Sequence, residues 1–184
     1  FADLKEGQKY YTIDFETDLD LFKSKLDEIT CIGGGDDAED VAGGLNAGLN
    51  MNWRSNARYA VLIADAPGHG SQYHTNEVQD DYESGDPNGL VLEDIMEKYV
   101  DSNINLCLTR IDEYTDIMFK AMIKAYTAKS EKSPDKPKIE IINYEEDEDT
   151  VETKKKEKKR TMGNLVAKTA IEIYNQYSQK ADKK

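Results

Sequence analysis

The stretch Cys31-Ile-Gly-Gly-Gly-Asp-Asp-Ala-Glu-Asp-Val41 joins three glycines to four acidic residues and then enters a helical pattern. Glycines let the backbone turn tightly and come close to a ligand or to another element. The positive end of a helix dipole tolerates the acids that follow. A phosphate loop also places glycines at a helix start, but four acids would repel a phosphate. The loop is therefore interpreted as either cation-facing or purely structural.

A second stretch, Tyr59-Ala-Val-Leu-Ile-Ala-Asp65, is a short apolar run that ends in an acid and precedes the loop Ala66-Pro-Gly-His-Gly70. Continuous apolar runs are typical of strands that are buried on both faces, as in a parallel sheet. Open α/β sheets bind their ligands beyond the carboxyl ends of such strands. We therefore expect Asp36 or Glu39 to lie near Asp65.

The composition limits the classes of partner. The chain has 184 residues and a net charge of −13, which argues against nucleic acid or an anionic membrane surface as the main partner. No apolar run is long enough to span a bilayer, so no membrane insertion is expected. Cys31 and Cys107 lack metal-type spacing and are interpreted as buried thiols of a reducing compartment, which predicts a cytoplasmic protein.

Strand and helix patterns alternate along the chain, which predicts an α/β fold of Rossmann-like type. Such alternation implies a mostly parallel sheet with helices on both faces, a three-layer α/β/α arrangement. The predicted strands cover residues 9–15, 59–64, 104–109 and 138–143, and the predicted helices cover 18–29, 38–51, 91–100, 112–129 and 162–180.

The predicted domain covers residues 1–144. The acidic and basic runs within 145–161 predict a solvated linker or insertion, although the basic run could also dock an acidic partner. Residues 162–184 are expected to form a terminal helix that packs back on the domain. The chain opens on Phe1 in what resembles the end of an element, so we expect further residues upstream.

No catalytic motif stands out in the sequence. There is no G-x-S-x-G, no Walker lysine and no kinase signature, and Gly33-Gly-Gly35 lacks the G-x-G-x-x-G spacing of a dinucleotide site. The sequence therefore predicts a protein that is not itself an enzyme. Residues 67–90 form an irregular connection of unusual length, and long loops in compact domains are often functional.

Two metal sites can be drawn from these residues. His69 and His74 lie near Asp65 and could bind zinc, but loop histidines more often support other ligands. A hard-cation site made of Asp36 or Glu39 together with Asp65 is better motivated, because Mg²⁺ binds one or two carboxylates and keeps several waters. The alternative is that these acids cap the helix and accept hydrogen bonds from loop N–H groups.

Three motifs together resemble the von Willebrand factor A-type domain, most closely the variety in alpha-kinase family proteins. The likeness covers residues 1–125. The motifs are Gly-Gly-Gly-Asp-Asp-Ala-Glu-Asp-Val (33–41), Leu-Asn-Ala-Gly-Leu-Asn-Met-Asn-Trp (45–53) and Ile-Ala-Asp-Ala-Pro-Gly-His-Gly (63–70).

The resemblance implies a metal-ion-dependent adhesion site, in which a bound ion is completed by an acidic group of a partner protein. Asp65 matches the family's acid after the fourth strand, and the second-loop ligand falls at Asp36 or Glu39. The ion would be Mg²⁺, with Mn²⁺ or Ca²⁺ as alternatives. Asp37, His69 and His74 are expected to support these ligands or to line the partner-binding loops.

The sequence departs from that family in one respect. The first ligand motif, Asp-x-Ser-x-Ser, is absent and would lie on a central strand upstream of Phe1, so the fold is expected to lack its N-terminal strands. We expect a protein-interaction module of this type. The alternatives are an accessory domain of an alpha-type serine/threonine protein kinase and a structural subunit of a large assembly with a degenerate metal site.

Overall fold

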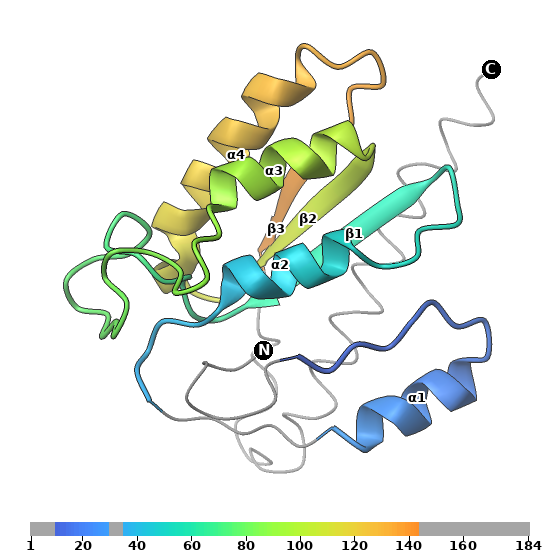
Figure 1. The fold of residues 1–184 in the computed structure, drawn as a ribbon, viewed down its shortest axis with the longest axis horizontal. Helices are drawn as coiled ribbons and strands as arrows, with labels where there is room; N and C mark the ends of the chain where they lie inside the picture. The colour runs from blue at the N-terminus through green and yellow to red at the C-terminus, as the bar shows by residue number, and fades with distance from the viewer. Residues whose placement is uncertain (1–9, 30–34, 144–184) are drawn as a thin grey trace. The chain divides into compact units, whose positions relative to one another are not determined.

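The computed structural model describes residues 10–29 and 35–143 (Figure 1). These residues form an α/β fold of Rossmann-like type, as the alternating pattern predicts. Its elements are α1 (Leu19–Asp27), α2 (Val41–Leu49), β1 (Arg58–Ala64), α3 (Leu92–Asp101), β2 (Ile104–Arg110), the 3₁₀ turn η2 (Glu113–Thr115), α4 (Asp116–Ser130) and β3 (Ile139–Asn143).

The sheet has three strands in the order β1-β2-β3. β1 and β2 run parallel, with Arg58 opposite Ile104 and Ala64 opposite Arg110. Both strands come from apolar runs, and their alternate residues point to opposite faces of the sheet. Their parallel direction places the residues that follow β1 and β2 at the same edge of the sheet.

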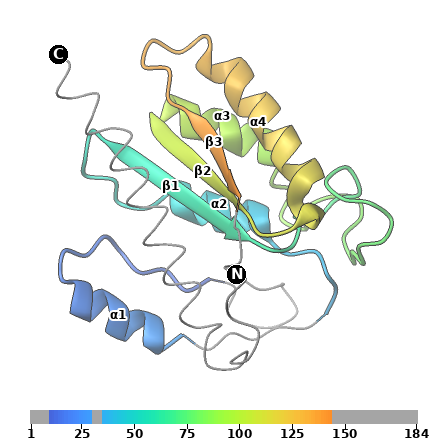
Figure 2. The ribbon, with the colours of Figure 1, turned by 180° about the vertical axis from the view of Figure 1, so that it is seen from behind.

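One face of the sheet carries the hydrophobic core. Leu62 of β1 and Leu106 and Leu108 of β2 are buried there against side chains of α2, α3 and α4. In Figure 1, α2 and α3 lie in front of the strands, and the reverse view in Figure 2 shows the strands in front of them. The sequence predicts helices on both faces of the sheet. Among the described residues, α2, α3 and α4 form the layer on this face.

The core explains why α3 and α4 form where the sequence predicts them. In α3 the buried residues Leu92, Ile95, Met96 and Tyr99 recur at helical spacing. Such a stripe makes one side of the helix apolar, and burying it against the sheet stabilises the helix. None of the described helices is long and apolar enough to cross a membrane.

The predicted strand at 9–15 is wrong for the residues that the structure describes. Residues 10–16 have no strand geometry, and Tyr11 and Phe15 are about half exposed, at 49% and 45%. A strand needs a neighbouring strand to accept its backbone hydrogen bonds, and this run has none among the described residues. Cys31, the run 145–161 and the helix expected at 162–184 lie outside those residues.

Candidate metal centre

Two loops that are far apart in sequence are joined by backbone hydrogen bonds at the carboxyl edge of the sheet. The N–H groups of Asp37 and Ala38 both donate to the carbonyl oxygen of Gln79, at 2.9 and 3.1 Å. The N–H of Glu39 donates to the carbonyl oxygen of Pro67 at 2.9 Å. These bonds hold the acidic stretch before α2 against the long loop that follows β1.

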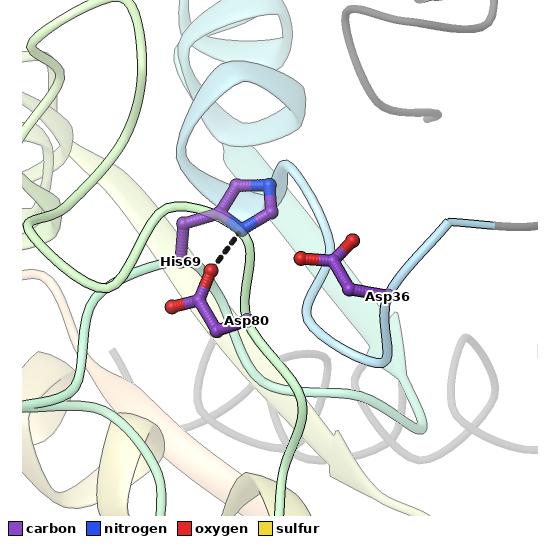
Figure 3. Close-up of side chains that lie close together, drawn as sticks. All are labelled: Asp36, His69 and Asp80. Atoms are coloured by element: carbon purple, nitrogen blue, oxygen red, sulfur yellow. Dashed lines mark hydrogen bonds and ion pairs between the residues drawn. The ribbon is translucent and has the colours of Figure 1, made fainter.

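The joined loops bring Asp36, His69 and Asp80 together. One ligand atom from each side chain lies within 4.8 Å of the other two, and this is the one such group of three among the described residues. Figure 3 shows the carboxylate of Asp36 turned toward the His69 imidazole, which is hydrogen-bonded to Asp80. The group could hold a metal ion.

Asp80 is the centre of the long loop. Its side chain is fully buried, and each carboxylate oxygen accepts two hydrogen bonds. Oδ1 accepts from His69 Nδ1 at 2.9 Å and from the Tyr82 N–H at 2.8 Å. Oδ2 accepts from the Gly70 N–H at 2.7 Å and from His74 Nε2 at 3.0 Å. The carboxylate therefore uses about four lone-pair sites, its full capacity.

These contacts determine the protonation state of Asp80. Burial on its own raises the pKa of the carboxyl, but the hydrogen bonds from His74, Gly70, Tyr82 and His69 outweigh burial, and the pKa is lowered from its usual value. Hydrogen bonds to a charged carboxylate favour the charged form. Asp80 is therefore an anion in the folded protein.

His74 also holds the carboxylate of Asp80 in place. Its Nε2 faces Asp80 Oδ2, and its Nδ1 faces the carbonyl oxygen of Thr75 at 2.9 Å. Both ring nitrogens are therefore engaged, and the two contacts hold the imidazole against Asp80.

Asp36 is the least satisfied member of the group. Its Oδ2 accepts from the Asp81 N–H at 2.5 Å. Its Oδ1 is buried and has no hydrogen-bond partner among the described residues. A buried carboxylate oxygen without a donor is costly, and a bound cation would remove that cost.

The remaining predicted site residues lie at the same edge but outside this group. Asp65 is exposed directly after β1, and Glu39 forms a bridge to Gly68. Asp37 accepts from the Gln79 N–H at 3.0 Å through Oδ2. The adhesion-type set of Asp65 with Asp36 or Glu39 stays a prediction, because the missing Asp-x-Ser-x-Ser motif would have to complete it.

A second pair of acids consists of Asp40 at the start of α2 and Asp86 in the long loop. Asp40 is 1% exposed and caps the helix, with Oδ1 accepting from the Gly43 N–H at 2.8 Å and Oδ2 accepting from the Tyr10 hydroxyl at 2.6 Å. The carboxyl of Asp86 lies within hydrogen-bonding reach of Asp40. Burial is the main cause that raises the pKa of Asp86, and the neighbouring Asp40 raises it further.

Sequence reasoning selected Asp36, His69 and His74 but did not select Asp80. The signal was present as both histidines and an aspartate within one long loop. However, the pairing of His69 with Asp80 spans eleven residues of irregular chain, and no helical or strand period indicates it. Only the folded loop shows that Asp80 holds both histidines.

Comparisons with known proteins point to one relative. The chain is 41% identical over 95 residues to the alpha-protein kinase vwkA of Dictyostelium discoideum. The match covers 51% of this chain and 15% of that kinase. No protein-family model matches the chain, and no solved structure matches it. Over half of its length, the chain is thus similar to a small part of an alpha-protein kinase.

Proposed function

We propose that this chain is a protein-interaction module of von Willebrand factor A type that accompanies an alpha-kinase. The observation that carries the proposal is the 41% identity over 95 residues to part of an alpha-protein kinase. The match covers only 15% of that kinase, which fits an accessory role better than a catalytic one. In this proposal the chain itself transfers no phosphate.

The carboxyl edge of the sheet supports the choice of docking surface. There the loop before α2 and the long loop after β1 are joined, with Asp65 exposed beside them. Ligand sites in open α/β sheets lie at this edge. The partner is a protein, which in the adhesion-type arrangement adds an acidic group to a divalent ion. Cys107 is a buried cysteine, and buried thiols suit the reducing cytoplasm.

The experiment is affinity purification from the source cells, with the captured proteins quantified by mass spectrometry. Three forms of the chain are compared: the wild type, Asp65→Lys at the docking edge, and Asp135→Lys in an exposed turn distant in sequence from that edge. We expect a partner that is captured by the wild type and by Asp135→Lys but is lost with Asp65→Lys. Capture of the same proteins by all three forms would reject the edge as the docking surface.

The link to an alpha-kinase has a separate test. Sequencing full-length transcripts from the source cells shows whether an alpha-kinase domain is encoded in the same reading frame, or whether the captured partner carries one. Either result supports the accessory role. Co-migration of the chain with a large assembly that contains no kinase would favour the structural-subunit alternative.

A further inference from the structure

We propose that Asp36, His69 and Asp80 bind one transition-metal ion of the zinc class. The site differs from the adhesion-type set, because it uses two residues of the long loop and not Asp65. It lies at the same edge as the proposed docking surface but does not depend on a partner, so the two proposals can fail separately.

The geometry is close to what a small four-coordinate ion requires. The three ligand atoms lie within 4.8 Å of one another. Zinc binds nitrogen and oxygen at 2.0–2.2 Å, so tetrahedral ligand atoms lie roughly 3.3 Å apart. The most separated ligand atoms must therefore close in by up to about 1.5 Å, while the backbone pairing to Gln79 keeps Asp36 on its loop.

The donor set selects the class of ion. An imidazole nitrogen with two carboxylates suits zinc and its neighbours, whereas magnesium prefers oxygen ligands and keeps several waters. The side chains of His69 and Asp80 are 1% and 0% exposed, which leaves little space for a hydrated ion. Three protein ligands leave a fourth position open for water or for a group of a partner.

The charges around the site favour a cation. Asp80 has His74 as a hydrogen-bond partner, but the buried Oδ1 of Asp36 has no donor among the described residues. An ion supplies the missing partner of that oxygen. His74 would continue to hold Asp80 through Oδ2, as outer hydrogen bonds commonly orient a metal ligand.

The test is calorimetry of the chain with Zn²⁺ at pH 7. We expect one ion to bind per chain. Asp36→Asn should weaken binding at least tenfold. Asp37→Asn is the matched control, because Asp37 also accepts one backbone hydrogen bond across the loops but lies outside the group. A large excess of Mg²⁺ should not compete.

Two further measurements are needed. Spectroscopy shows whether the bound ion is adventitious, and thermal unfolding shows whether a variant is misfolded. Co²⁺ should give the visible absorption of a tetrahedral nitrogen and oxygen site in the wild type and in Asp37→Asn, but not in Asp36→Asn. Thermal unfolding without metal should show that both variants fold. Equal zinc binding by all three proteins, competition by Mg²⁺, or no binding by the wild type would overturn the proposal.

Discussion

The carboxyl of Asp86 lies within hydrogen-bonding reach of the carboxyl of Asp40, and its buried Oδ2 has no hydrogen-bond partner among the described residues. The other oxygen of Asp86 accepts from the N–H groups of Asn88 and Leu90, at 2.8 and 3.1 Å. The two carboxyls can bond only when one of them carries a proton, as in other close acid pairs. This pair makes the start of α2 sensitive to pH.

Asp86→Asn is expected to stabilise the protein at neutral pH. The folded pKa of Asp86 is raised above its usual 3.8. Its protonated form therefore favours folding below pH 3.8, and that stability is lost as the pH rises through the folded pKa. Asparagine keeps the oxygen that Asn88 and Leu90 need and offers an N–H to Asp40. Urea unfolding at pH 4 and pH 7 should show a gain that is larger at pH 7.

The control for this substitution is Asp135→Asn, which neutralises an exposed acid in a turn. It changes the net charge equally but should leave the pH dependence of unfolding unchanged. If Asp86→Asn lowers the urea midpoint at pH 7, the carboxyl pair does not oppose folding.

Asp80→Asn is expected to destabilise the protein at neutral pH by about 3 kcal/mol, the usual cost of breaking a buried charged network. The asparagine amide would face donors that now meet a carboxylate oxygen. Because the folded pKa of Asp80 is lowered, its stabilising effect is present above pH 3.8 and is lost as the pH falls through the folded pKa. The difference from wild type should therefore shrink in acid, as followed by circular dichroism. A constant difference at every pH would contradict this role.

Gly68→Ala and Gly70→Ala should have opposite outcomes although they lie two residues apart. A Cβ at Gly68 would meet Val41, Met118 and Leu92 at 3.4 Å or more, which is ordinary contact. Gly70 has a φ of +112°, a conformation that costs alanine about 1–3 kcal/mol. Thermal unfolding should place Gly68→Ala at or above the wild type and Gly70→Ala clearly below it. Equal melting temperatures would be inconsistent with this backbone geometry.

Tyr99→Phe should cost about 1 kcal/mol, the usual net worth of one hydrogen bond. The Tyr99 hydroxyl lies in the core and donates to the carbonyl oxygen of Leu45 at 2.9 Å, which ties α3 to α2. Tyr114→Phe is the control, because Tyr114 is 53% exposed. Urea unfolding of both variants measures the difference. If Tyr114→Phe lowers the free energy of unfolding as much as Tyr99→Phe does, the buried hydrogen bond does not add to stability.

The strands of the core could be predicted because their residues carry the signal themselves. The run at 59–64 is apolar and the run at 104–109 is mostly apolar, and they correspond to β1 and β2 within one residue at their ends. The run at 9–15 has similar β-type residues but finds no strand partner in the described part of the chain. Local composition predicts a strand only where the fold supplies a neighbour.

The candidate site could be predicted only in part. Asp36 and His69 were selected because glycine-rich loops beside a strand end commonly carry ligands. Asp80 was not selected, because its importance comes from donors that arrive from positions 69, 70, 74 and 82 once the loop has folded. No periodic pattern in the sequence indicates that these four donors meet at one carboxylate. Whether Asp65 also binds an ion stays a prediction.

The four hydrogen bonds at Asp80 also act as a cross-link. They tie residues 69, 70, 74 and 82 of a loop without helices or strands to one buried point, and so reduce the number of conformations the chain can adopt. A disulfide does the same for small secreted proteins through a covalent bond. Here the link is a carboxylate, which is weakened by protonation and not by reduction. The loop can therefore stay closed in a reducing environment, where a cystine would be cleaved.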